Sequence, residues 1–215
     1  MCKLKSAIVL KDRIFMPDYD SHSDMLKELG IKDDYLGASK TFVRAELSPK
    51  NGDMFSDIDG WELTVDQDIT PDWFDPDETK ARMIEKTKEW AKTHIHIGVE
   101  GLKISVGQNH YIKDCEGVEI RGSATVKYIY GSATVENICD SATVEYIYDS
   151  ATVKNICGSA TVEKASGHSV ICASPWGPWH RRESTVLLEN STLKDNYGKV
   201  IYQAGEYQLV HVKAK

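Results

Sequence analysis

The sequence has no long hydrophobic run. A membrane-spanning helix needs about 20 consecutive apolar residues, and no segment of the 215 residues approaches that length. The first residues, MCKLKSAIVLKDR, interrupt a short apolar run with charge and offer no small-residue cleavage site, unlike a signal peptide. These absences predict a protein with neither a membrane segment nor a secretory leader.

Cysteine is also scarce. The cysteines are odd in number and none belongs to a CxxC motif, whereas secreted domains held by disulfides have even numbers. We therefore expect reduced cysteines and a cytoplasmic location. The five are Cys2, Cys115, Cys139, Cys157 and Cys172.

Positive charge is lacking in part of the N-terminal region. The formal net charge is −7, and residues 53–78 contain ten acidic residues but no lysine or arginine. Such a segment repels phosphates, so we expect no nucleic-acid partner. We interpret the acidic run as a solvated face. The alternative is a surface that imitates DNA or meets a basic partner.

What the sequence does contain is a nine-residue repeat. Residues 122–157 read GSATVKYIY GSATVENIC DSATVEYIY DSATVKNIC, and SATV recurs once more at 159–162. Within each unit Ala and Val alternate with Ser, Thr and a charged residue, as in a strand with one buried side. Gly or Asp in the first position supplies turn chemistry. Short identical strands at a fixed period are typical of a stacked solenoid.

The tails of the units alternate between YIY and NIC, and this predicts two units per coil. With eighteen residues per coil, like residues stack on like, and adjacent coils about 4.8 Å apart gain aromatic and amide contacts. The aligned pairs would be Tyr128–Tyr146, Tyr130–Tyr148, Asn137–Asn155, Cys139–Cys157, Lys127–Glu145 and Glu136–Lys154.

No cofactor is predicted. The nonapeptide period is that of calcium-binding RTX repeats, but the GGxGxD turns that present their carboxylates are missing. Cys139 and Cys157 could form a metal pair, but no further ligand is placed beside them. We interpret them as small residues of the ladder.

The rest of the chain predicts a mixed fold, in which a small α+β head precedes the β-solenoid. In the head, SAIVL and RIFMP indicate a hairpin, and Ser23 with Asp24 can cap a short helix that runs through Leu29 and stops at Gly30. TFVRAEL and WELTV indicate strands, DPDETKARMIEKTKEWAKTH indicates a helix, and HIHI indicates a strand with Ile95 and Ile97 inward. The expected domains are 1–97 for the head, 98–121 for a cap at the start of the solenoid, 122–175 for the solenoid and 176–215 for a C-terminal cap of further strands.

Several segments together resemble a family of phage and prophage proteins of gut bacteria. They are KSAIVLKDRIFMPDYDSHSDMLKELGIKDD, FVRAEL, WELTVDQDITPDWFD, EWAKTHIHIG and the SATV-type repeats, so the resemblance covers nearly the whole chain. It implies an α+β head on a solenoid of variable length. It brings no activity or catalytic residue with it.

Two surfaces are candidates for binding. The loop SPWGPWHRRES places Trp and Arg, which dominate interface energetics, beside Pro and Gly. The alternative is that its tryptophans plug the last coil and its arginines are solvated. The second surface is the tyrosine face of the repeats, where rigid amphipathic rings line up. The candidate binding residues are Trp176, Trp179, His180, Arg181 and Arg182 in the loop, and Tyr128, Tyr130, Tyr146 and Tyr148 on the face.

A metal-dependent active site is the alternative to binding. DYDSHSD places Asp18, Asp20 and His22 within a few residues of one another, and such hard ligands can hold a hydrolytic metal. Its structural interpretation is a helix cap. The GxSxG, P-loop, HExxH and GxGxxG motifs do not occur.

The sequence therefore favours a non-enzymatic, phage-type binding protein of the bacterial host cytoplasm, with a host protein as its partner. The role as an inhibitor of host defence follows from the resemblance alone. The alternatives are a metal-dependent hydrolase built on the Asp/His cluster and a solenoid that associates with copies of itself.

Overall fold

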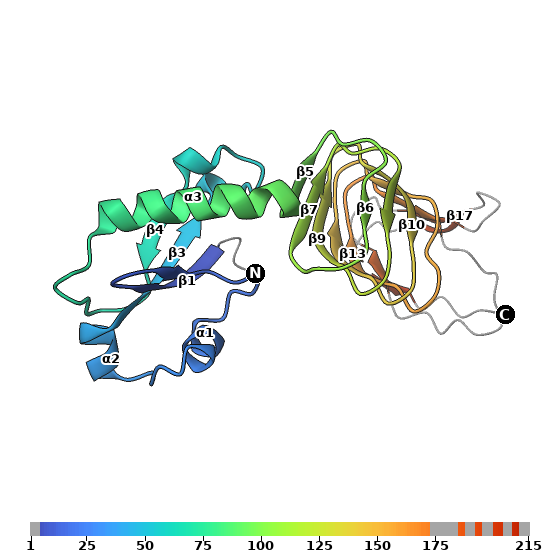
Figure 1. Ribbon diagram of the computed structural model, residues 1–215. Helices are drawn as coiled ribbons and strands as arrows, with labels where there is room; N and C mark the ends of the chain where they lie inside the picture. The colour runs from blue at the N-terminus through green and yellow to red at the C-terminus, as the bar shows by residue number, and fades with distance from the viewer. Residues whose placement is uncertain (1–4, 173–184, 188–191, 195–199, 204–207, 211–215) are drawn as a thin grey trace. The chain divides into compact units, whose positions relative to one another are not determined.

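The computed structural model describes residues 5–172, 185–187, 192–194, 200–203 and 208–210, and it divides the chain into two compact units, Met1–Thr93 and His94–Lys215. The first unit is a small α+β head, and the second is a β-solenoid whose coils stack on one another (Figure 1). This confirms the mixed fold predicted from the sequence.

The head contains a four-stranded antiparallel sheet in the order β2-β1-β3-β4. Its strands are β1 (Lys5–Leu10), β2 (Ile14–Phe15), β3 (Phe42–Ser48) and β4 (Glu62–Val65). Along β3 buried side chains alternate with partly exposed ones, the period-2 pattern of a strand with one covered face. The hairpin predicted around Lys11 and Asp12 joins β1 to β2 and is confirmed.

Three α-helices accompany the sheet, with α1 and α2 on one side and α3 on the other (Figure 1). They are α1 (His22–Glu28), α2 (Tyr35–Lys40) and α3 (Pro76–His94), and the 3-10 turns Lys50–Gly52 and Ile58–Gly60 lie between β3 and β4. Ser21 caps α1 by accepting a hydrogen bond from the Asp24 amide. Helix α2 was not predicted from the sequence. Among the described helices, none is both long enough and apolar enough to span a bilayer.

The solenoid has two sheets on opposite sides of one core, and their strands are parallel except for the last strand of each. The first sheet contains β6 (Lys103–Ile104), β8 (Val118–Ile120), β10 (Thr134–Ile138), β12 (Thr152–Val153), β14 (Val170–Cys172), β16 (Thr192–Lys194) and β17 (Val200–Gln203). The second contains β5 (Ile95–Ile97), β7 (His110–Lys113), β9 (Thr125–Tyr130), β11 (Thr143–Ile147), β13 (Thr161–Ala165), β15 (Thr185–Leu187) and β18 (Gln208–Val210).

Each coil of the repeat region uses two nonapeptides, as predicted. Thr134 pairs with Thr152, and Thr125 pairs with Thr143. The repeated Ala, Val and Ile side chains fill the space between the sheets as one continuous cluster of buried residues. No single strand could bury this surface alone, so the coils stabilise one another through their stacking.

The first position of each nonapeptide takes a left-handed backbone conformation. Gly122, Gly131, Asp140, Asp149 and Gly158 have φ between +57° and +69°, a region that glycine enters without cost and that aspartate tolerates. The Asp140 carboxylate accepts a hydrogen bond of 3.0 Å from the Gly122 amide of the preceding coil. The choice of Gly or Asp at this position therefore follows from the turn conformation and from this bond between coils.

The solenoid begins earlier than the domain boundaries expected from the sequence. Strand β5 already pairs in parallel with β7, and residues 98–121 form strands of the two sheets. At the other end β17 and β18 run antiparallel to their neighbours, so the chain reverses direction where the parallel stack ends.

The predicted orientation of HIHI is wrong. Ile97 is 54% exposed, whereas His94 is only 8% exposed. The reason is the register of β5, because Ile97 pairs with Lys113 on the outer face, while His96 pairs with the core residue Ile112.

Candidate functional site

Five tyrosines from three neighbouring strands stack on one outer face of the solenoid. We call this surface the tyrosine wall, and it consists of Tyr111 of β7, Tyr128 and Tyr130 of β9, Tyr146 of β11 and Tyr148 directly after β11. The wall exists because alternate residues of a strand share a face and because the eighteen-residue coil places Tyr128 beside Tyr146. The predicted alignment of the tyrosines is confirmed.

Tyr128 lies at the centre of the tyrosine wall. Its ring centroid is 5.2 Å from that of Tyr146, 5.5 Å from Tyr130 and 5.7 Å from Tyr111. Tyr130 and Tyr148 form a second column with centroids 5.1 Å apart. These separations lie in the range of favourable aromatic pairs, so contacts between the rings stabilise their arrangement.

The stacking decides which parts of the rings a partner could meet. Neighbouring rings are inclined to each other by 7° to 22°, and the centroids of stacked pairs from adjacent coils are 5.1 to 5.7 Å apart, so these rings are nearly parallel and offset. At the end of one column, the Lys164 ammonium lies 5.2 Å from the centroid of the Tyr146 ring, which occupies that ring face through a cation–π contact. Neighbouring rings and Lys164 therefore occupy part of the aromatic faces in the Tyr128–Tyr146 column.

Charged residues form a row beside the tyrosine wall. Lys127 pairs with Glu145 at 2.8 Å, as the sequence predicted. Glu145 is only 9% exposed, and within the described part of the chain its Oε2 has no hydrogen-bond partner. The next residue in register is Glu163, because Val144 pairs with Val162. The row thus begins with a matched ion pair and ends with two like charges.

The central tyrosine stays protonated over a wide pH range. Burial, together with the neighbouring Tyr130, Tyr148, Tyr146 and Glu145, raises the pKa of Tyr128 to about 12. A phenol of this kind donates hydrogen bonds at neutral pH and does not act as a base or nucleophile.

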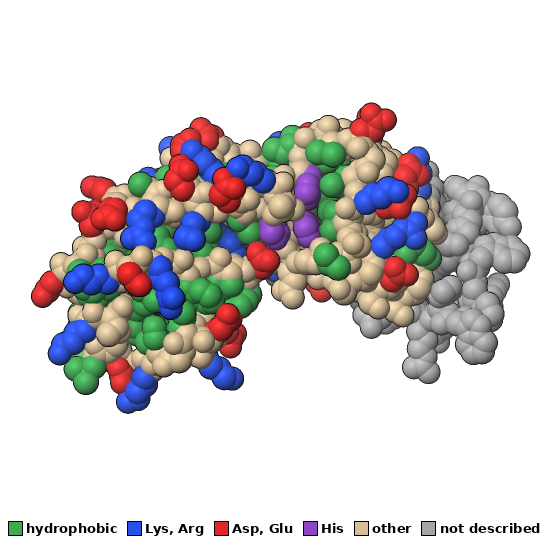
Figure 2. Space-filling view, viewed as in Figure 1, with side chains coloured by type: hydrophobic (Ala, Val, Ile, Leu, Met, Phe, Trp, Pro, Cys, Tyr) green, Lys and Arg blue, Asp and Glu red, His purple; other side chains and the backbone are tan. Residues whose placement is uncertain are grey.

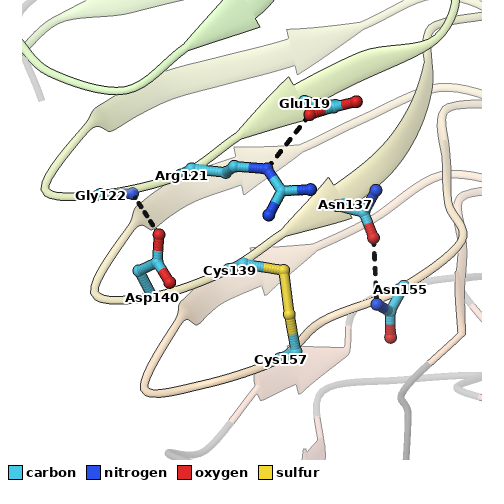
Figure 3. Close-up of a disulfide and its surroundings, with 8 residues drawn as sticks. All are labelled: Glu119, Arg121, Gly122, Asn137, Cys139, Asp140, Asn155 and Cys157. Atoms are coloured by element: carbon cyan, nitrogen blue, oxygen red, sulfur yellow. Dashed lines mark hydrogen bonds and ion pairs between the residues drawn. A yellow bond between two sulfur atoms is a disulfide. The ribbon is translucent and has the colours of Figure 1, made fainter.

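The opposite wall of the same coils holds the amide ladder and a disulfide (Figure 3). The side-chain Nδ2 of Asn155 donates to the side-chain Oδ1 of Asn137 at 3.1 Å, and the Lys154 ammonium lies 2.6 Å from the Glu136 carboxylate. Both pairs were predicted from the eighteen-residue period.

Cys139 and Cys157 are joined by a disulfide between adjacent coils (Figure 3). The prediction that the cysteines are reduced is therefore wrong for this pair. The register explains the bond, because the eighteen-residue spacing brings the two Cα atoms to 4.6 Å, within the range that a disulfide spans. The inference of a cytoplasmic location from reduced cysteines loses its basis for these two residues. Cys115 is a buried free thiol.

The tryptophan and arginine loop lies outside the described residues. Its candidate residues Trp176, Trp179, His180, Arg181 and Arg182 all fall within 173–184. Their assignment to a binding loop stays a prediction from the sequence.

The structure does not bring Asp18, Asp20 and His22 together as one ligand group. The Asp20 carboxylate accepts a hydrogen bond from the Ser6 amide and lies 3.6 Å from the Lys5 ammonium. Burial lowers the pKa of Lys5, and Asp20 and Asp18 act in the opposite direction. His22 instead contacts Ala45 and Asp66, two residues that the sequence did not single out.

Sequence reasoning also missed two residues that stack with Tyr128 and Tyr146. Tyr111 stacks on Tyr128, and Lys164 lies over the ring of Tyr146. Counting eighteen residues back from Tyr128 leads to His110, but the register shifts between His110 and Tyr111, so that Tyr111 becomes the partner of Tyr128. Lys164 pairs with Tyr146 in register, and the period alone could have found it.

Comparison of the chain with protein-family models, with curated proteins and with solved structures found no match.

Proposed function

We propose that the chain is a non-enzymatic binding protein and that the tyrosine wall contacts a partner protein. The observation that carries the proposal is the stack of five tyrosines, whose rings are held by one another before any partner arrives. Tyrosine gives a large amphipathic contact area at low entropic cost, and a surface that is already ordered loses less freedom on binding.

The ring edges and hydroxyl groups of the tyrosine wall favour a protein as the partner over a ligand that stacks on a ring face. A planar ligand or a sugar needs an open ring face, whereas part of the ring faces in the Tyr128–Tyr146 column is occupied by neighbouring rings and by Lys164. Hydroxyl groups and ring edges, with the Lys127–Glu145 pair beside them, suit the mixed polar and apolar surface of a folded protein.

The proposed partner is a protein of a bacterial host, and the proposed role is inhibition of host defence. Both parts rest on the resemblance to phage and prophage proteins that the sequence suggests. A phage-type role of this kind implies a location in the host cytoplasm. The Cys139–Cys157 disulfide argues against a cytoplasmic location, because such bonds are typical of oxidising compartments.

The test compares two double variants in a pull-down from a bacterial host lysate. The double variant Tyr130→Ser with Tyr148→Ser removes one stacked pair of tyrosines from the tyrosine wall. The double variant Asn137→Ser with Asn155→Ser removes one stacked pair of asparagines from the opposite wall of the same region. The proposal expects a single captured protein whose affinity falls at least about tenfold for the tyrosine variant alone. Circular dichroism checks that both variants keep the fold.

Equal capture by both variants would exclude the tyrosine wall. A mass in solution that rises with concentration and falls in the tyrosine variant would identify a second copy of the chain as the partner. Trp179→Ala with Arg181→Ala, assayed in parallel, tests whether the loop predicted from the sequence contributes.

A further inference from the structure

Three segments of the head bring a histidine and two carboxylates together. His22 is the first residue of α1, Glu46 lies in β3 and Asp66 directly follows β4. One ligand atom from each residue lies within 4.8 Å of the others. The register of the sheet creates this arrangement, since Glu46 pairs with Thr64 and Asp66 is the next residue of that chain segment on the same face.

The hydrogen bonds of His22 determine which nitrogen faces the carboxylates. The His22 side chain is 9% exposed, and its Nε2 lies 3.3 Å from the Ala45 carbonyl oxygen. A carbonyl only accepts, so Nε2 carries the proton. Nδ1 lies 3.3 Å from Oδ2 of Asp66. In a neutral imidazole this nitrogen has a lone pair and no proton, so two acceptors face each other unless a positive species joins them.

The surroundings of the cluster carry more negative than positive charge. The carboxylates of Asp66 and Asp20 act on the Glu46 carboxyl as like charges, and His22 acts in the opposite direction. Lys5 contacts Asp20 and the Pro17 carbonyl oxygen, and Arg44, whose backbone carbonyl accepts from the Asp66 amide, pairs with Asp33. A cation placed among His22, Glu46 and Asp66 would offset both the repulsion between the carboxylates and the cost of their partial burial.

We propose that Nδ1 of His22 and the carboxylates of Glu46 and Asp66 bind one divalent transition-metal ion, with Zn²⁺ as the best match. One imidazole nitrogen and two carboxylate oxygens form a donor set that zinc accepts, whereas calcium and magnesium prefer oxygen ligands alone. Two ligands on a tetrahedral zinc at its usual bond lengths are about 3.3 Å apart, which equals the separation of His22 Nδ1 and Asp66 Oδ2.

Two further features fit this assignment. Histidine ligands commonly donate their second ring N–H to a backbone carbonyl, which fixes the ring and its tautomer, and His22 does so to Ala45. Three protein ligands also leave one position of a tetrahedral ion open. The Asp66 side chain is 61% exposed, so at least one of the three ligands lies at the protein surface. The ligand set differs from the one expected from sequence, with Glu46 and Asp66 replacing Asp18 and Asp20.

Isothermal titration calorimetry of the full chain, stripped with a chelator and titrated with ZnCl₂ at neutral pH, tests the proposal. We compare wild type with Asp66→Asn, which changes an exposed side chain and should leave the fold intact. Asp68→Asn is the matched control, because it removes the same charge from an exposed residue of the same segment. We expect one strong site in wild type and in Asp68→Asn, and at least about tenfold weaker binding in Asp66→Asn.

Cobalt supplies a second readout that identifies the donor atoms. Co²⁺ bound to nitrogen and oxygen ligands gives weak visible bands, whereas binding by a cysteine thiolate adds an intense charge-transfer band. The proposal expects the weak bands alone and their loss in Asp66→Asn. Equal zinc affinity in all three proteins, a thiolate band, or no uptake by wild type would overturn it.

Discussion

Tyr128 combines the greatest number of ring contacts in the tyrosine wall with nearly complete burial. It stacks on four other tyrosines and is only 6% exposed. Burial of a phenol disfavours its charged form, and the pKa of Tyr128 rises from 10.0 to about 12. The wall is therefore stabilised by protonated rings, and it should weaken where they ionise.

This raised pKa predicts a loss of stability in alkali. Between pH 10 and about 12 the folded chain keeps a proton on Tyr128 that the unfolded chain releases. The stabilisation linked to this proton is complete below pH 10 and disappears as the pH rises through the folded pKa. Tyr128→Phe should therefore show a shallower fall in the free energy of unfolding over this range, measured by urea denaturation at a series of pH values.

The control for this experiment is Tyr35→Phe, since Tyr35 is 69% exposed and belongs to the head. Its pH profile should follow that of wild type. Parallel profiles for all three proteins would show that Tyr128 ionises alike in the folded and unfolded chains.

Single residues were predicted from the sequence where the period alone places them. Tyr146 beside Tyr128 and Asn155 beside Asn137 follow from counting eighteen residues. The same count placed Cys139 beside Cys157, but an argument from compartment and composition led to reduced thiols, whereas their geometry permits a disulfide. For this pair, the eighteen-residue spacing was a better guide than the general rule that relates cysteine composition to compartment.

At the scale of elements, the turns of the solenoid share one backbone conformation but differ in the space around them. Gly122 has φ +62°, and a Cβ added there would lie 2.3 Å from the Ser105 carbonyl oxygen. Gly101 has φ +65°, and a Cβ there would meet nothing within 4 Å. Comparing substitutions at the two glycines therefore separates the free-energy cost of the left-handed conformation from that of crowding between coils.

Gly101→Ala should destabilise the solenoid by about 1 kcal/mol, the cost of a side chain in the left-handed region. Gly122→Ala should cost more, by roughly a further 1–3 kcal/mol, because the methyl group overlaps a backbone atom of the neighbouring coil. Thermal unfolding followed by circular dichroism measures both. Similar losses for the two variants would mean that the turn at Gly122 moves away from Ser105 at no cost.

Regular elements were predicted well, and irregular ones were not. The repeat fixes strands and register because the same pattern recurs in every coil. The register shift at His110 and the outward orientation of Ile97 depend on pairing with a particular neighbour, which no local pattern encodes. Likewise, His22, Glu46 and Asp66 come from three separate segments, so their meeting requires the pairing of β3 with β4.

The whole molecule consists of two units with different sources of stability. The head buries its own apolar cluster of Ile8, Met25, Leu26 and Phe42. Its charged side chains are interspersed in sign over the face seen in Figure 2, which is typical of a solvated surface. The solenoid instead depends on contacts between successive coils, and its one described disulfide joins two of them.

The disulfide should therefore stabilise the solenoid and leave the head unaffected. It connects residues 18 apart, and closing a loop of about this length stabilises a folded protein by roughly 3 kcal/mol in the chain-entropy model. Cys139→Ser with Cys157→Ser should lower the protection of the β10 and β12 amides against hydrogen exchange while that of β1 in the head stays unchanged. A reductant should have the same effect on wild type and none on the double variant. If protection in β1 falls together with that in β10, the two units do not unfold independently, and the coils do not form a separate cooperative unit.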